Sequence, residues 1–217
     1  HVLVDIDLPD DIWVGNNDIL GFVYQSLMTE GERNLIGQYY TSKNIAEYML
    51  CHKCLMPGET FLDPCCGSGT FLLSVSTNTP ECLYGFDIDS VAVMVAGTNL
   101  LVKYRYHDFV PHVYCLDFLQ KDLLTSNDAL IPTKFDNIYT NPPWGTDKKG
   151  LYINNYPEIK SKERSSMFIV EAVKRLKTEG NFYFLLPMSL LKTNIHRDVR
   201  KYILSNTSVQ KIDLYTG

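Results

Sequence analysis

The chain has 217 residues, of which 45% are hydrophobic and 21% are charged. These values are typical of a globular domain that buries its own core, and they exclude collagen-like and low-complexity chains. The formal net charge of −5 excludes a domain whose overall field would hold nucleic acid, so we expect any such contact to be local or supplied by another domain. The sequence shows no apolar run long enough to cross a bilayer and no signal peptide, which predicts no membrane association and a cytoplasmic location.

The six cysteines follow no regular framework, which indicates reduced thiols. Cys51 and Cys54 have the spacing of a zinc-binding pair. A structural zinc site needs four ligands, and the sequence offers no second pair at a suitable separation. We therefore expect no metal site, and we interpret both cysteines as small residues on the flank of a helix.

Residues 1–36 are predicted to form an N-terminal helical extension, because apolar side chains in 18–28 recur at helical spacing. A further helix is predicted to start at an N-cap, Thr41 or Ser42, and to end before Pro57-Gly58. Residues 37–217 show no internal repeat and no interdomain linker, so we expect them to form one domain.

From Phe61 onward, short apolar runs alternate with longer segments of helical spacing, which predicts crossover connections and a mainly parallel sheet. Strands are predicted at 60–63, 82–87, 111–116, 135–140, 181–186 and 209–214. Helices are predicted at 68–77, 90–104, 165–178 and 196–205, the third followed by Gly180 as a helix-ending glycine. The expected fold class is α/β with a doubly wound, mainly parallel sheet.

Ligands of such a sheet bind outside the carboxyl ends of its strands. After the first predicted strand comes Asp63-Pro64-Cys65-Cys66-Gly67-Ser68-Gly69, in which two glycines allow a sharp turn and a close approach to a ligand. The segment lacks the third glycine of a dinucleotide loop and the lysine of a Walker loop. The carboxylate of Asp63 favours a ligand with a cationic group and would repel a pyrophosphate. An ordinary glycine turn capped by Asp63 is the alternative.

The next two strands also end on acidic residues. Asp87 is placed to accept the two hydroxyls of a ribose, whereas Asp89 is predicted to cap the helix that begins near Ser90. Asp117 can accept from the exocyclic amine of an adenine, and the backbone N–H of Phe118 can donate to a ring nitrogen.

After the fourth predicted strand comes Asn141-Pro142-Pro143-Trp144. Two prolines fix φ and remove two donors, so this turn is rigid and presents oxygen acceptors. The Asn141 side-chain oxygen and the Pro142 carbonyl could accept both hydrogens of a planar amine. Trp144 offers an aromatic face on which a base could stack. This combination selects an –NH2 substrate.

Together these segments resemble the S-adenosylmethionine-dependent amino-methyltransferases, and most of all the adenine-N6 DNA methyltransferases of restriction–modification systems. Gly37-Gln38-Tyr39-Tyr40-Thr41 is similar to the family segment that helps to hold the methionine part of the cofactor, although Ser42 replaces the usual proline. The motif order resembles the gamma class. Thr140 stands where a glycine is common. The resemblance implies a Rossmann-like class I methyltransferase fold for residues 37–217.

The resemblance also implies the roles of individual residues. The residues implied to bind S-adenosyl-L-methionine are Tyr40, Thr41, Asp63, Cys65, Gly67, Gly69, Asp87, Ile88, Asp117, Phe118 and Asn141. The residues implied to act on the target base are Asn141, Pro142, Pro143 and Trp144.

DNA is the implied substrate, and specificity or restriction subunits are implied partners. The family pattern implies a further strand after 209–214 and then a target-recognition region. We therefore expect this chain alone to bind cofactor but to lack full DNA recognition.

Two groups of alternatives remain open at this point. Methyltransferases that modify the N5 of a protein glutamine or the N2 of an RNA guanine also carry Asn-Pro-Pro-aromatic, and a non-catalytic scaffold subunit could keep the cofactor-binding fold. The loop 144–164 carries five basic and three acidic side chains. It is predicted either to meet DNA phosphates beside a flipped base or to be a solvated mobile loop.

Overall fold

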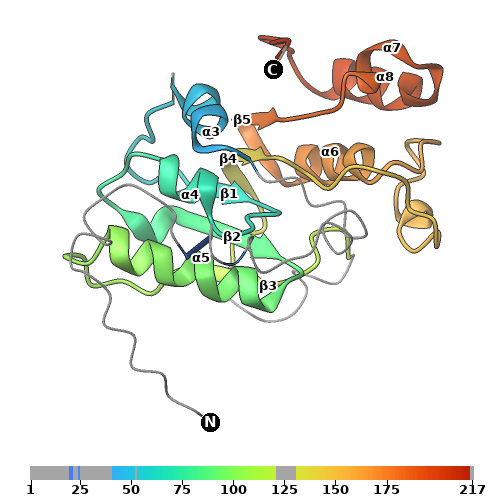
Figure 1. Ribbon diagram of the computed structural model, residues 1–217. Helices are drawn as coiled ribbons and strands as arrows, with labels where there is room; N and C mark the ends of the chain where they lie inside the picture. The colour runs from blue at the N-terminus through green and yellow to red at the C-terminus, as the bar shows by residue number, and fades with distance from the viewer. Residues whose placement is uncertain (1–19, 22–23, 25–40, 52, 121–130, 216–217) are drawn as a thin grey trace.

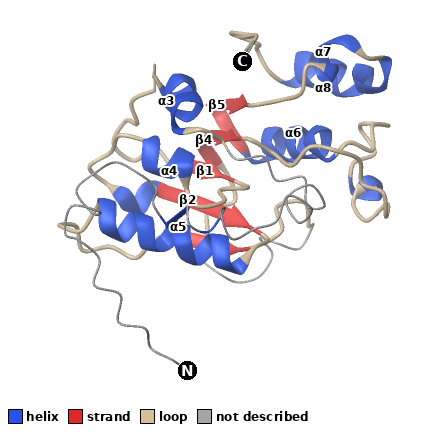
Figure 2. Ribbon diagram, viewed as in Figure 1, coloured by secondary structure: helices blue, strands red, loops and turns tan. Residues whose placement is uncertain are grey.

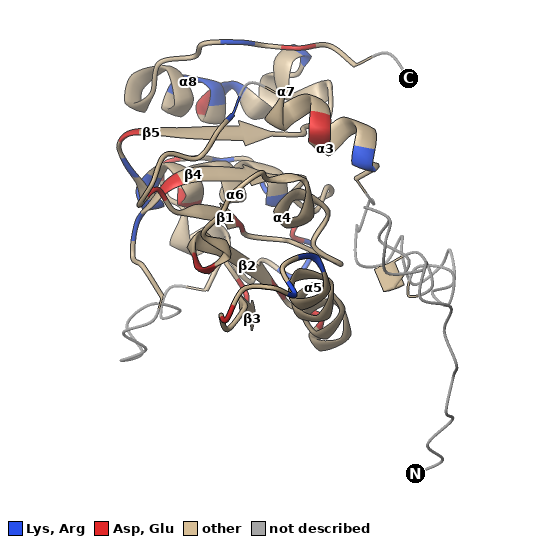
Figure 3. Cartoon of the chain, turned by 90° about the vertical axis from the view of Figure 1, so that its left-hand side faces the viewer, with Lys and Arg blue, Asp and Glu red and all other residues tan. Residues whose placement is uncertain are grey.

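A computed structural model describes residues 20–21, 24, 41–51, 53–120 and 131–215. Its centre is a five-stranded sheet of order β3-β2-β1-β4-β5, in which each neighbouring pair is parallel (Figure 1). The strands are β1 (Phe61–Asp63), β2 (Leu83–Asp87), β3 (His112–Cys115), β4 (Phe135–Thr140) and β5 (Leu176–Phe184). Figure 3 shows them one below another, from β5 at the top to β3 at the bottom. The doubly wound parallel sheet expected from the sequence is confirmed.

Helices cover both faces of the sheet (Figure 2). The helices are α3 (Lys43–Leu50), α4 (Thr70–Ser74), α5 (Ser90–Lys103), α6 (Arg164–Arg175), α7 (Ser189–Lys192) and α8 (Arg197–Asn206), with short 3-10 turns at Pro80–Cys82, Ile153–Asn155 and Asn194–His196. Neighbouring residues of a strand point to opposite faces. Phe61 accordingly packs in the cluster of α3, α4 and α5, whereas Leu62 packs in the cluster of α6, α7 and α8.

The predicted helix starts are confirmed at two caps. Ser42 caps α3, and its Oγ accepts from the Ile45 N–H at 3.4 Å. Asp89 caps α5, and its Oδ1 accepts from the Val91 N–H at 2.9 Å. Each cap satisfies a backbone donor that the first helical turn leaves open. The predictions for β1 to β4, α5 and α8 are also confirmed, within about one residue at each end.

Three predicted elements had wrong boundaries. Helix α4 covers only Thr70–Ser74 of the predicted 68–77. Helix α6 ends at Arg175, and β5 begins at the next residue rather than at 181. Gly180 is therefore not a helix-ending glycine. It lies where the β4–β5 register shifts, and a Cβ on it would come within 2.9 Å of the Asp136 carbonyl oxygen, so the close approach of the two strands requires a glycine.

The strand predicted at 209–214 was also wrong. This segment has no strand pairing. It meets the rest of the chain through side chains: the Tyr183 hydroxyl donates to Asp213, and Lys211 Nζ lies 3.5 Å from the Tyr48 hydroxyl. Val209 and Ile212 remain exposed. An alternating apolar pattern forms a strand only where the backbone of a neighbouring strand can pair with it by hydrogen bonds. The side-chain contacts of this segment do not provide such pairing.

Part of the expected organisation lies outside the described residues. Of the helix predicted in 18–28, only Leu20, Gly21 and Tyr24 are described, and all three are helical. The division at residue 36 stays a prediction. No helix among the described residues is long and apolar enough to span a membrane. Within the same residues, no three His, Cys, Asp or Glu side chains are grouped as metal ligands would be.

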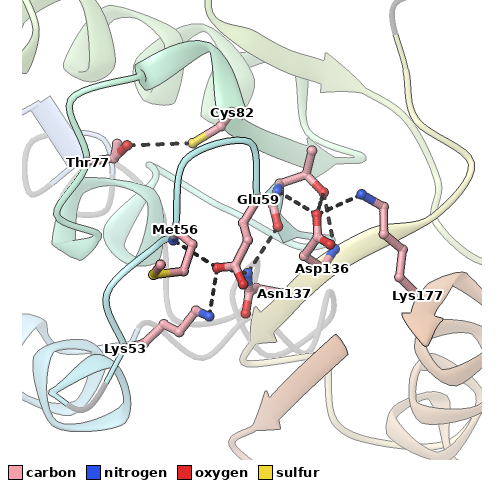
Figure 4. A network of polar contacts seen from close by, with 9 residues as sticks. Lys53, Met56, Glu59, Thr77, Cys82, Asp136, Asn137 and Lys177 are labelled. Carbon is pink, nitrogen blue, oxygen red and sulfur yellow. Dashed lines mark hydrogen bonds and ion pairs between the residues drawn. The ribbon is translucent and has the colours of Figure 1, made fainter. Parts of the chain in front are cut away.

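Two carboxylates fasten the amino ends of the central strands (Figure 4). Asp136 of β4 accepts from the Thr60 N–H and from Lys177 Nζ, each at 2.8 Å. Glu59 accepts from Asn137 Nδ2 at 3.4 Å. These groups join the start of β1 to β4 and β5, so they are structural and lie at the end of the sheet opposite to the candidate site.

Candidate active site

The first predicted site residue, Asp63, ends β1 and is only 1% exposed. Its Oδ1 accepts from the Thr140 hydroxyl at 2.6 Å and from the Cys65 N–H at 3.2 Å. Burial, with a smaller contribution from the charge of Asp87, raises the pKa of Asp63 to about 7, although the two hydrogen bonds act in the opposite direction. Both donors meet the same carboxylate oxygen, Oδ1.

The glycine turn that follows has the backbone geometry its sequence predicts. Gly67 and Gly69 have φ values of +52° and +96°, in the left-handed region that favours glycine. A Cβ on Gly67 would meet no atom within 4 Å, whereas one on Gly69 would lie 3.3 Å from the Cβ of Ala96. Gly67 therefore leaves open space beside the turn, and Gly69 lets the turn pack on α5.

Asp87 ends β2 beside this turn. Its Oδ2 accepts from the Gly67 N–H at 2.8 Å, and its Oδ1 accepts from the Asp89 N–H at 3.0 Å. Burial raises the pKa of Asp87 despite these two hydrogen bonds. Ile88, the next residue, is 60% exposed. The end of β2 therefore carries a buried carboxylate, Asp87, followed by an exposed apolar side chain, Ile88.

Asp117 lies in the turn after β3. Its Oδ1 accepts from the Leu119 N–H at 3.0 Å, and its Oδ2 accepts from the Tyr152 hydroxyl at 2.6 Å. The Phe118 ring is buried in the core, 5.5 Å from the Phe168 ring centre. The predicted contact of Phe118 with a ligand concerns its backbone N–H, and it stays a prediction.

The turn at Asn141-Pro142-Pro143-Trp144 directly follows β4, and no cis peptide bond occurs in the described residues. Cys65 Sγ lies 2.9 Å from Thr140 Oγ1 and 3.4 Å from the Asn141 carbonyl oxygen. Burial, and then the charge of Asp63, raises the pKa of the Cys65 thiol well above its usual value, so it stays a neutral donor. Arg164 Nη2 donates to the Trp144 carbonyl at 3.3 Å. The turn is thus held from the β1 side and from the start of α6.

The loop 144–164 is closed at its base. Thr146 and Glu163 form an antiparallel bridge, and the Asp147 N–H donates to the Lys162 carbonyl at 2.7 Å. Asp147 is buried, and Glu158 forms an ion pair with Lys174 at 2.7 Å. The lysines of the loop are exposed: Lys148, Lys149, Lys160 and Lys162. Glu163 accepts from the Thr146 hydroxyl at 3.0 Å. All three acidic side chains of the loop are therefore engaged, while its lysines face solvent.

The strand order places the carboxyl ends of β3, β2, β1 and β4 next to one another, so the four predicted positions share one edge of the sheet. Thr41 is buried just before the cap of α3. Tyr40 lies outside the described residues. No sequence pattern pointed to Tyr152, or to Arg164 as a donor to the Trp144 carbonyl. Thr140 could have been singled out from the sequence, because it stands where the resembling family commonly has a glycine.

This fold is shared with class I methyltransferases. A modification subunit assigned to a type I restriction enzyme of Vibrio vulnificus YJ016 superimposes with a TM-score of 0.63 at 22% identity, over 86% of this chain and 42% of that one. A protein of Listeria monocytogenes assigned as a class I S-adenosylmethionine-dependent methyltransferase gives 0.62 at 16% identity, over 86% and 57%. Identities this low show the fold alone.

The chain belongs to the N-6 DNA methylase family, which it matches over residues 15–214. The Type II methyltransferase M.VspI of Vibrio sp. (strain 343) is 33% identical over 205 residues, which are 89% of this chain and 47% of that protein. The chain therefore spans about half the length of this relative. The family resemblance inferred from the motifs is confirmed.

Proposed function

We propose that this chain transfers the methyl group of S-adenosylmethionine to the N6 amine of adenine in DNA, as the catalytic part of a restriction–modification enzyme. The observation that carries the proposal is the join between the two halves of the site. Thr140 and Cys65 connect the Asp63 carboxylate to the backbone of Asn141 by hydrogen bonds. The carboxylate proposed to bind the cofactor and the turn proposed to bind the target amine therefore belong to one hydrogen-bonded unit.

The residues at the strand ends fit the proposed cofactor. The carboxylate of Asp63 suits the ammonium group of the methionine part, and Asp87 suits the ribose hydroxyls. The open space beside Gly67 suits close approach of the ligand to the backbone. Asp117 suits the adenine amine. S-Adenosylmethionine, when bound, supplies a methyl group on a positively charged sulfur.

The turn after β4 suits the target amine. The lone pair of an adenine amine is delocalised into the ring, which makes the nitrogen a weak nucleophile. Acceptance of its two hydrogens by the Asn141 side-chain oxygen and the Pro142 carbonyl favours a pyramidal nitrogen, and orientation lowers the barrier further. Asn141 is not a base, so the excess proton leaves to solvent after transfer.

A base in duplex DNA must be flipped out to reach this turn, at a cost of a few kcal/mol. Stacking on Trp144 offsets part of that cost. The exposed Lys148 and Lys149 follow the turn closely in sequence, and their charge suits contact with DNA phosphates near the flipped nucleotide. The whole enzyme's recognition and restriction functions would belong to further regions or partner subunits.

The proposal is tested with tritiated S-adenosylmethionine and three acceptors: DNA without methylated bases, a glutamine-containing peptide, and RNA. Nucleosides and amino acids are separated after digestion and analysed by mass spectrometry. We expect N6-methyladenine from DNA. Methylation of only the peptide or only the RNA would contradict the proposed substrate. Absence of cofactor binding by calorimetry would contradict the proposed site and favour a scaffold subunit.

A further inference from the structure

Two tyrosines of the loop 144–164 hold the turn that follows β3. The Tyr152 hydroxyl donates to Asp117 Oδ2 at 2.6 Å, and the Tyr156 hydroxyl donates to the Leu119 carbonyl at 3.2 Å. The loop starts at the carboxyl end of β4, and β4 is separated from β3 by two strands in the sheet. The loop therefore reaches from the amine-binding turn to the turn that carries Asp117.

The contact from Tyr152 completes the fixing of the Asp117 carboxylate. One carboxylate oxygen accepts from the Leu119 N–H at 3.0 Å, and the other accepts from Tyr152. A donor on each oxygen prevents rotation of the carboxylate and gives its remaining lone pairs a fixed direction. Burial, followed by the hydrogen bond to Asp117, raises the pKa of Tyr152 to about 12, so the hydroxyl stays a donor at neutral pH.

The backbone of Tyr152 is hydrogen-bonded to another residue of the loop. Its backbone N–H donates to Asp147 Oδ2 at 2.9 Å, and the Asp147 N–H donates to the Lys162 carbonyl at 2.7 Å. The Asp147 side chain is buried. A continuous set of hydrogen bonds thus runs from Asp117 to the base of the loop, three residues after Trp144.

We propose that Tyr152 is a positioning residue for cofactor recognition: its hydroxyl aims the Asp117 carboxylate at the amine of the cofactor's adenine and ties that contact to the loop beside the amine-binding turn. This inference rests on the proposed function, in which Asp117 binds the adenine. It assigns the selectivity for adenine over other purines to a pair of residues from two elements.

The test compares two ligands that differ at the contact with Asp117. S-Adenosylhomocysteine presents an amine donor there, whereas S-inosylhomocysteine presents a carbonyl oxygen that a carboxylate repels. Calorimetry gives the ratio of their dissociation constants. A site built to bind a polar group rejects an analogue that lacks it. We expect Tyr152→Phe to lower the preference for the adenine form about tenfold, mostly through weaker binding of that form, because a hydrogen bond to a charged group is lost.

Tyr156→Phe is the matched control, because it removes a hydroxyl from the same loop that contacts the Leu119 carbonyl and, at 3.4 Å, the Glu171 carboxylate, but not Asp117. It should leave the preference unchanged while lowering the melting temperature. Tyr152 is only partly buried and its replacement removes one oxygen, so we expect the variant to fold, as checked by circular dichroism. An unchanged preference in Tyr152→Phe, or an equal loss in Tyr156→Phe, would overturn the inference.

Asp117→Asn separates this inference from the function on which it rests. If Asp117→Asn abolishes the preference and Tyr152→Phe does not change it, Asp117 binds the adenine without help from Tyr152. If Asp117→Asn keeps the preference, Asp117 is not the adenine ligand. Both the role proposed for Asp117 and the role proposed for Tyr152 would then be wrong. Loss of the preference in both variants, with the double variant no worse than Asp117→Asn alone, supports the inference.

Discussion

The Thr140 hydroxyl donates a hydrogen bond of 2.6 Å to Oδ1 of Asp63, across two neighbouring strands. Asp63 ends β1, and Thr140 ends β4 immediately before Asn141. Glycine is common at position 140 in the resembling family, so this contact depends on a side chain that the usual residue would not provide. It joins Asp63, the carboxylate proposed to bind the cofactor, to the turn proposed to bind the target amine.

Removal of this hydroxyl should weaken cofactor binding. Thr140→Val keeps the shape but loses the donor, so the charged form of Asp63 is disfavoured and its pKa rises further. A hydrogen bond to a charged group contributes about 1.5 kcal/mol or more, which predicts a loss of about tenfold in affinity for S-adenosylmethionine. Thr140→Ser keeps the donor and should bind within about twofold of the unchanged chain. Calorimetry at pH 7 measures both, and equal affinities for all three would disprove the role of the hydroxyl.

Cofactor affinity should rise with pH between 5.5 and 7.5. The pKa of Asp63 in the free protein is about 7, and a cationic ligand binds the ionised form, so binding releases a proton below pH 7. The dissociation constant should fall about tenfold per pH unit up to that pKa and then level off. Calorimetry in two buffers of different ionisation enthalpy counts the released proton. A dissociation constant that does not change with pH would show that Asp63 binds no cation.

Asp63→Asn is the companion of that experiment. Because the pKa of Asp63 is raised in the folded state, its ionisation costs stability as the pH rises from about 4 to 7, and the cost stays constant above that range. The variant should therefore melt at a higher temperature than the unchanged chain at pH 8 and at a similar temperature at pH 4. It should also lose cofactor binding. A lower melting temperature at pH 8 would contradict this account.

Gly69 should not tolerate a side chain. Its φ is +96°, and a Cβ would lie 3.3 Å from the Cβ of Ala96, so Gly69→Ala should destabilise the protein by about 1–3 kcal/mol and impair cofactor binding. Gly97→Ala is the control in the same region. A Cβ at Gly97 meets no atom within 4 Å and φ is not positive, so that change should stabilise α5 by up to about 1 kcal/mol. Urea denaturation measures the free energy of unfolding of both variants. Similar effects of the two changes would show that the turn does not need the left-handed conformation at Gly69.

The lysines of the loop 144–164 should contribute to the salt dependence of DNA binding. Lys148→Gln with Lys149→Gln should reduce the slope of log affinity against log salt by up to about 2, because fewer counterions are released. The same double change at two exposed lysines outside the loop, Lys192 and Lys201, should leave the slope unchanged. Fluorescence anisotropy with labelled duplex DNA, on the enzyme with its recognition region, gives both slopes. Equal slopes for the two pairs would leave the loop without a phosphate contact.

The positions of the site could be predicted from the sequence because each one follows a strand of strong apolar pattern. β1, β2 and β4 are buried nearly throughout, so their ends, and the residues just beyond them, could be located. The edge of the sheet was less predictable. β5 is only partly buried, and its start and the coil at 209–214 depend on pairing with a neighbouring strand, which local pattern does not encode.

The contacts that organise the site could not be predicted, because each joins residues far apart in sequence. The Tyr152 hydroxyl and Asp117 are 35 positions apart, and Thr140 and Asp63 are 77 positions apart. No spacing rule connects such pairs. Their proximity follows from the strand order and from the way the loop packs on the core, which become known only once the chain is folded.

The central claim is that Asn141 acts mainly on the target amine and contributes only little to cofactor binding. Its most direct test compares Asn141→Ala with the unchanged sequence. Calorimetry measures the binding of S-adenosylmethionine, and the enzyme with its recognition region is assayed for formation of N6-methyladenine in DNA with a mismatched adenine, for which flipping costs least. We predict cofactor affinity within about threefold and a loss of turnover of about a thousandfold. Retained turnover, or a loss of cofactor binding as large as the loss of turnover, would contradict the claim.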